Sequence, residues 1–167
     1  MAVVEGQRVK TADLRAVLTR RPAVLAEELA RIDPADRSYV AAETNAFLVG
    51  WLSALPCTVV NRPTPTSLCG PAWGELHWRM AAARVGVVWA ETDHPEEAHE
   101  VVVCGKHCLF ARTPGQARAA MALALAAGVE LLSIRFHGDR VSGASVAPSL
   151  DNPDVRARLL SYLMGPA

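Results

Sequence analysis

Apolar residues recur along this chain with two periods, one typical of helices and one typical of short strands. The longest helical pattern covers 36–55, where Val40, Phe47, Trp51 and Leu55 can share one broad apolar face. Proline and glycine residues at suitable boundary positions delimit the other helical patterns. These further predicted helices cover 23–32, 71–84, 114–127 and 154–164.

Short apolar runs between these helices predict strands, and two tight turns join the last four runs into hairpins. The turns are Gly105-Lys106 and His137-Gly138-Asp139. The pattern predicts an α/β fold, with α+β as the alternative, in which helices flank small mixed sheets. The predicted strands cover 16–19 (or the end of a helix), 57–60, 87–90, 101–104, 107–111, 129–136 and 141–147.

The acidic segment 91–100 contains Pro95 and predicts a loop. It separates a helix-rich front half, 1–91, from a back half, 100–167, built of hairpin, helix, hairpin and helix. No convincing linker divides the chain, so we expect the two halves to form one compact unit.

The composition limits the class of binding partner and the cellular compartment that we expect for the protein. The 167 residues include 17 Lys plus Arg and 17 Asp plus Glu, so the net charge is zero. This balance argues against a nucleic-acid binder that works through bulk charge, and no basic run suggests a membrane anchor. No apolar stretch is long enough to cross a bilayer, and the first residues do not have the pattern of a signal peptide. We therefore expect a cytoplasmic protein whose four cysteines are reduced thiols.

Two segments contain residue types that could bind a metal or act in catalysis. In the first hairpin, Cys104 and His107 would face each other beside Cys108, a pairing that suits zinc or a nucleophile with its base. The alternative is that these cysteines are small core residues. The acidic segment holds His94 and His99, but their spacing and Pro95 favour a solvated loop over a cation site.

Basic and aromatic residues form two further groups of candidate binding residues. Arg20 and Arg21 follow one predicted strand, and Asn61 and Arg62 follow another, so both pairs can lie at one end of a sheet and hold a carboxylate or phosphate. Pairing with local acids is an equal alternative. The aromatic group, which fits a partner groove or core packing, consists of Trp73, Trp78 and Trp89 with His77.

Several segments, taken in order, resemble the ATP-grasp ligases. The front half contains AVLTRRP, a helix with Glu43, and TVVNRPTPTSLCGPAWGELHWRMAAARVGV. The back half contains EVVVCGKHCLFAR, AAGVELLSIRF and SVAPSLDNPDVRARLLSYL. These segments are similar to the family branch that ligates amino acids or cross-links peptides, namely ribosomal-protein glutamate ligases and graspetide maturases. The resemblance implies a partial ATP-grasp scaffold over most of the chain.

The departures from the family pattern are as informative as the matches. Where the family inserts its central ATP-gripping subdomain, this chain has only the short segment between Thr92 and Glu100. At the positions of the family's metal ligands, which are an Asp and a Glu-x-Asn, this chain has Arg135, Ser145 and Ala147. These three residues cannot supply the carboxylate oxygens that magnesium requires. The resemblance therefore implies a scaffold that no longer binds ATP productively, with no metal or cofactor.

The resulting hypothesis is a non-catalytic pseudoenzyme that binds a precursor peptide or a partner ligase in a peptide or natural-product pathway. Loss of a subdomain exposes surface, so a homodimer or a hetero-complex is expected. The alternative is a small enzyme that reuses the cleft, with a Cys/His or arginine-lined site for a small anionic substrate. The candidate binding residues are Arg20, Arg21, Asn61, Arg62, Trp73, Trp78, Arg135 and His137.

Overall fold

Two stretches of the chain fold around separate hydrophobic cores. The computed structural model describes residues 2–4, 6–91 and 98–165, and its elements form a mixed α/β fold. The units are Met1–Pro71 and Ala72–Ala167. Trp78, Ala81 and Ala82, which the sequence analysis assigned to the front half, belong to the core of the second unit.

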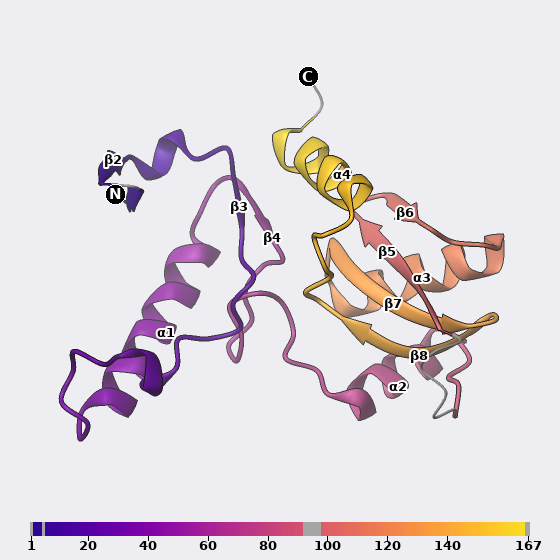
Figure 1. Cartoon of the computed structure of the whole chain (residues 1–167), viewed down its shortest axis with the longest axis horizontal. Helices are drawn as coiled ribbons and strands as arrows, with labels where there is room; N and C mark the ends of the chain where they lie inside the picture. The colour runs from indigo at the N-terminus through magenta and orange to yellow at the C-terminus, as the bar shows by residue number, and fades with distance from the viewer. Residues whose placement is uncertain (1, 5, 92–97, 166–167) are drawn as a thin grey trace. The chain divides into compact units, whose positions relative to one another are not determined.

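The first unit is built on a parallel pair of strands, β3 (Ala16–Leu18) and β4 (Thr58–Val60). The long helix α1 (Arg37–Ser53) packs against this pair, and the small core consists of Leu52, Leu55, Val59 and Leu68 (Figure 1). Near the N-terminus, β1 (Ala2–Val4) and β2 (Gln7–Val9) form an antiparallel pair, which is followed by the 3-10 turn η1 (Thr11–Asp13). The strands predicted at 16–19 and 57–60 and the helix predicted at 36–55 are confirmed.

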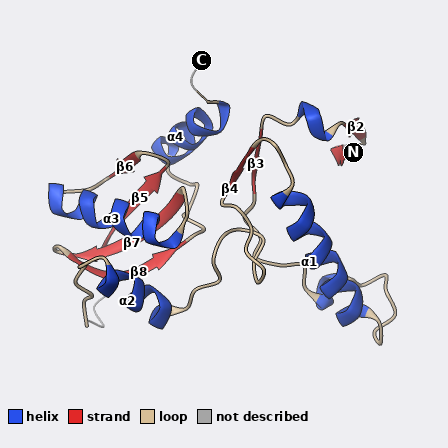
Figure 2. Ribbon diagram, turned by 180° about the vertical axis from the view of Figure 1, so that it is seen from behind, coloured by secondary structure: helices blue, strands red, loops and turns tan. Residues whose placement is uncertain are grey.

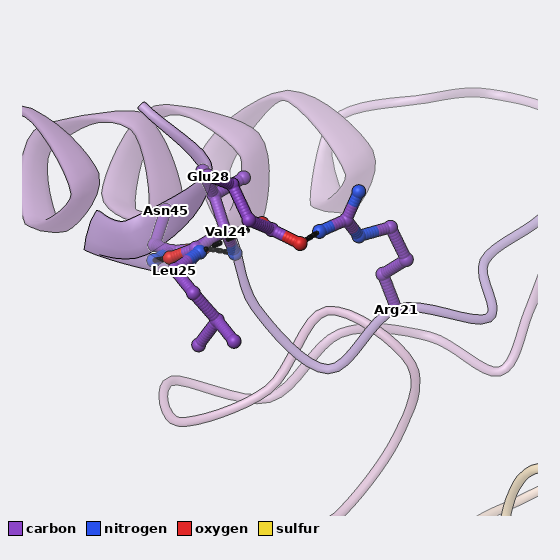
Figure 3. A network of polar contacts seen from close by, with 5 residues as sticks. All are labelled: Arg21, Val24, Leu25, Glu28 and Asn45. Carbon is purple, nitrogen blue, oxygen red and sulfur yellow. Dashed lines mark hydrogen bonds and ion pairs between the residues drawn. The ribbon is translucent and has the colours of Figure 1, made fainter. Parts of the chain in front are cut away.

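Two details of the first unit differ from the prediction. The helix predicted over 23–32 is wrong, because only the 3-10 turn η2 (Ala26–Glu28) forms there. The side-chain amide of Asn45 accepts from Val24 N at 2.8 Å and donates to Val24 O at 2.9 Å, which holds Val24 outside a helix (Figure 3). Phe47 is also 68% exposed, so it does not share the packed face of α1.

The second unit is a four-stranded antiparallel sheet with the strand order β6-β5-β7-β8 (Figure 2). Both predicted hairpins are confirmed. The first joins β5 (His99–Cys104) to β6 (His107–Leu109), and the second joins β7 (Leu131–His137) to β8 (Arg140–Ser145). The helices are α2 (Glu75–Arg84), α3 (Pro114–Ala127) and α4 (Pro153–Met164).

The two faces of this sheet have different neighbours. On one face Val101, Val103, Ile134 and Phe136 pack with residues of α2 and α3 to form the main core. Because side chains alternate along a strand, Val102, Cys104, Ser133 and Arg135 project from the opposite face. Helix α4 contacts β5 and buries Val155 and Leu159. The Ser133–Arg135 end of the second face is polar.

Side-chain caps begin α3 and α4, whereas no side-chain cap hydrogen bond forms at the start of α1 or α2. Thr113 Oγ1 accepts from Gln116 N at 3.1 Å at the start of α3, and Asn152 Oδ1 accepts from Asp154 N at 2.9 Å at the start of α4. Helix α2 begins at Glu75 rather than at residue 71. The strand predicted over 87–90 is reduced to a single bridge between Trp89 and Val141. Within the described ranges, no helix combines the length and apolarity needed to cross a membrane.

Candidate functional site

The arginine and asparagine candidates lie where the sequence placed them, at one end of a parallel strand pair. Leu18 and Val60 are register partners, so Arg20-Arg21 and Asn61-Arg62 follow the aligned carboxyl ends of β3 and β4. Thr19 N donates to Val60 O at 2.9 Å and closes this end of the pair. Arg21 forms an ion pair with Glu28 (Figure 3), so pairing with a local acid, the alternative that the sequence left open, holds for Arg21.

The tryptophan candidates contribute to the core of the second unit. Trp78 is buried, and its ring meets that of Trp73 edge to face with centroids 4.8 Å apart. Trp73 and Trp89 are half-buried against the same core. Core packing therefore accounts for Trp73 and Trp78, whereas His77 is exposed on α2.

The Cys104–His107 pair has the predicted register but not the environment of a reactive site. The two residues are direct partners across the first hairpin, where Cys104 is fully buried and His107 is exposed. Burial raises the pKa of the Cys104 thiol, and the nearby charge of Arg158 opposes this only in part. Burial also raises the pKa of the Cys108 thiol. Both groups therefore favour the neutral thiol, which is a poor nucleophile and a poor metal ligand.

The histidines of the acidic segment do not form a site that the structure describes. His94 lies outside the described residues, whereas His99 begins β5, and its Nε2 lies 3.1 Å from the side-chain oxygen of Gln116. Among residues 2–4, 6–91 and 98–165, no three His, Cys, Asp or Glu side chains lie close enough to hold a metal ion.

A polar pocket lies on the sheet face opposite the main core, and it contains residues from three neighbouring strands. This sheet-face pocket has a volume of about 250 Å³. Arg135, Ser145 and Ala147, the three positions that the ATP-grasp resemblance aligns with metal ligands, all lie in its wall. His137, the other candidate on β7, does not. The pocket is lined by Glu100, Ser133, Arg135, Gly143, Ala144, Ser145 and Ala147.

The strand register explains how Arg135 is placed in this pocket. On β7, Arg135 lies directly opposite Glu100 of β5 on one side and Gly143 of β8 on the other. The guanidinium group lies over Gly143, so close that an added Cβ there would be 2.5 Å from Nη2 and 2.8 Å from Nε. The guanidinium group can therefore occupy this position only because residue 143 has no side chain.

Arg135 and Glu100 are exposed and carry opposite charges, yet they do not form an ion pair. Arg21 and Arg79, by contrast, do form ion pairs. No described residue accepts a hydrogen bond from the Arg135 guanidinium, whose donors remain available. A guanidinium with free donors beside the hydroxyls of Ser133 and Ser145 is suited to a carboxylate or a phosphate.

Sequence reasoning named Arg135 as a binding candidate and gave Ser145 and Ala147 only as positions where the resemblance places lost metal ligands. It did not place Glu100 or Ser133 in the same site. The available signal was the alternation of SIRF, which puts Ser133 and Arg135 on one face. The position of Glu100 depends on the pairing of β5 with β7, which a single sequence does not fix.

Neither a family model, nor a curated protein, nor a solved structure matches this chain. The resemblance to ATP-grasp ligases therefore stays a prediction that rests on the order of its motifs. The chemistry of the sheet-face pocket has to be inferred from the residues that line it.

Proposed function

We propose that the protein is a non-catalytic, ATP-grasp-like pseudoenzyme that binds a peptide through a carboxylate held in the sheet-face pocket. The observation that carries this proposal is the Arg135 guanidinium, which lies over Gly143 in a polar pocket with its donors unpaired among the described residues. A carboxylate offers two oxygens at the spacing of the guanidinium fork, so two parallel hydrogen bonds can form.

The same residues argue against magnesium-dependent ligation in this pocket. Mg²⁺ is held by carboxylate and phosphate oxygens in octahedral geometry. Glu100 is the one carboxylate among the residues that line the pocket, and the cation of Arg135 stands directly across from it. The positive charge of Arg135 would repel a magnesium ion bound to Glu100. The pocket therefore favours recognition of an anionic group over phosphoryl transfer.

The biological setting follows from the sequence motifs. A peptide-binding relative of the branch that ligates amino acids or cross-links peptides would present a precursor peptide, in the cytoplasm, to an active ligase. It would act as a homodimer or in a complex with that ligase. The sheet-face pocket would hold a carboxylate of the precursor, contributed either by an acidic side chain or by the C-terminus.

Isothermal titration calorimetry on the full chain tests this proposal with two hexapeptide probes. One has a free C-terminus and no acidic side chain, and the other is amidated and contains two glutamates. At least one probe should bind, and the comparison identifies the source of the carboxylate. Arg135→Gln should weaken that binding about tenfold or more, because it removes a charge-assisted pair. Arg140→Gln, at an exposed position at the start of β8, should bind like the parent chain.

Two results would overturn the proposal. If neither peptide binds, or if Arg135→Gln binds as well as Arg140→Gln, the pocket does not hold a carboxylate. If saturating ATP with Mg²⁺ raises the melting temperature by several degrees, the chain binds nucleotide and is not the pseudoenzyme proposed, because a ligand stabilises the folded state to which it binds. Size-exclusion chromatography with light scattering tests the expected homodimer separately.

A further inference from the structure

A second cluster of unpaired charges lies in the same unit, along one side of helix α4. Two adjoining pockets, with volumes of about 550 Å³ and about 390 Å³, run between α4 and the first hairpin. Arg158 and Ser161, both on α4, line both pockets. The pockets therefore adjoin at these two side chains, and we call the pair of pockets the α4 groove.

The larger part of the α4 groove is mainly apolar. Its wall includes Leu109, Phe110 and Ala157, with the half-buried thiol of Cys108. Phe110 is 41% exposed and has a φ of 63°, in the left-handed region that non-glycine residues rarely adopt. An exposed phenyl group leaves apolar surface in contact with water. A ligand with an apolar body would cover it.

The smaller part of the α4 groove is cationic. Lys106 and His107 approach from the hairpin turn, and Arg158 approaches from the helix. In the described part of the chain, none of these three side chains makes an ion pair or a hydrogen bond. Two carboxylates lie nearby. Asp154 lines the larger pocket four residues before Arg158 on α4, and the charge of Glu130 adds to burial in raising the pKa of Tyr162, which lines the smaller pocket. Because neither Lys106 nor Arg158 forms an ion pair with a described residue, both charges remain available to an incoming anion.

The hairpin turn holds these groups in a fixed place relative to α4. Gly105 has a φ of 58°, and an added Cβ there would clash with the ring of Tyr162. Gly105 N also donates to Glu130 O at 2.7 Å, at the entrance to β7. The turn therefore packs directly against the helix, and the backbone of Lys106 and His107 is ordered before any ligand arrives, which lowers the entropic cost of binding.

We propose that the α4 groove binds a small amphipathic anion, with its carboxylate or phosphate head beside Lys106, His107 and Arg158 and its apolar body along Leu109, Phe110 and Ala157. This inference does not rest on the proposed peptide function, because it concerns a different set of residues. The two head groups share the same chemistry, since each offers several oxygens to a guanidinium fork and to a lysine ammonium.

Octanoate and octyl phosphate, kept below the concentrations at which they form micelles, are suitable probes for calorimetry on the full chain. At least one of them should bind, and the tighter one identifies the preferred head group. Octanol tests the apolar body alone, inorganic phosphate tests the head alone, and each should bind at least about tenfold more weakly than the better probe. Arg158→Gln should weaken the better probe by a similar factor, and Lys106→Gln, at an exposed turn position, provides a second variant.

Arg118→Gln is the matched control, because Arg118 is exposed on α3 and does not line the groove. It should bind the better probe like the parent chain, and circular dichroism should show that all three variants are folded. The proposal is overturned if neither probe binds, if octanol binds as tightly as the better probe, or if Arg158→Gln and Lys106→Gln both bind like Arg118→Gln.

Discussion

Replacing Gly143 with alanine should weaken peptide binding without unfolding the protein. The added Cβ would stand 2.5 Å from Nη2 and 2.8 Å from Nε of Arg135. Ordinary van der Waals contact begins near 3.4 Å, so the guanidinium must withdraw by roughly 1 Å, a displacement large enough to spoil a binding geometry. The position of Arg135 in the sheet-face pocket therefore depends on the glycine opposite it.

The stability change expected for Gly143→Ala is small. Gly143 does not have a positive φ, so alanine can adopt its backbone conformation. The atoms in the way belong to the end of an exposed, flexible arginine, and rotating that end away costs on the order of 1 kcal/mol or less. Alanine in place of glycine in a strand recovers about 0.5 kcal/mol or more. The free energy of unfolding should therefore change by less than about 1 kcal/mol.

The binding change should be larger than the stability change. Losing a bidentate carboxylate contact costs about 1.5–3 kcal/mol, which is tenfold or more in Kd. Calorimetry with the peptide that binds the parent chain measures this change, and urea denaturation measures stability. If Gly143→Ala acts through Arg135, the double variant with Arg135→Gln should bind no more weakly than Arg135→Gln alone. Additive losses, or full binding by Gly143→Ala, would refute the reasoning.

Three further predictions concern the second unit. Gly105→Ala combines a left-handed φ with a clash against Tyr162, so the free energy of unfolding should fall by about 2 kcal/mol or more. Gly138 has a left-handed φ but open space around it, so Gly138→Ala should lower the free energy of unfolding by only about 1–2 kcal/mol. Urea denaturation compares the two variants. Gln116→Leu should cost about 1–3 kcal/mol by the same assay, because it removes the hydrogen bonds that the buried Gln116 amide makes with Arg112 N and Gly138 O. Cys104 should react with iodoacetamide far more slowly in the folded chain than in urea, as mass spectrometry can follow. Burial raises the pKa of Cys104 on folding, so the neutral thiol contributes to the free energy of unfolding. This contribution should be fully present below the ordinary thiol pKa and should be lost as pH rises through the raised pKa.

Local signals predicted the parts of the fold that are set by neighbouring residues. The turn at Gly105-Lys106 and the starts of the helices predicted at 114 and 154 each depend on backbone preferences within a few residues, so a single sequence reveals them. The segment 23–32 has a helical pattern, but Asn45 supplies both hydrogen bonds of Val24 from 21 residues away. Such a contact is visible only once the chain has folded.

Some residues of the sheet-face pocket could be predicted from the sequence and others could not. Arg135 could be named as a binding candidate because it stands in a segment that resembles a known motif. Glu100 could not, because its place opposite Arg135 is set by the pairing of two strands separated by α3. Phe47 was wrongly placed on the packed face of α1, because this helix is apolar on several sides and its sequence pattern does not indicate which side is packed.

The buried amide of Gln116 links three segments that are distant in sequence. Its oxygen accepts from Arg112 N at 2.7 Å and lies 3.1 Å from His99 Nε2, and its nitrogen donates to Gly138 O at 2.6 Å. The first turn of α3 therefore cannot fray without also releasing the start of β5 and the β7–β8 turn. In native-state hydrogen exchange, the backbone amides of these three segments should open together as one cooperative unit, with protection well above that of an ordinary helix end.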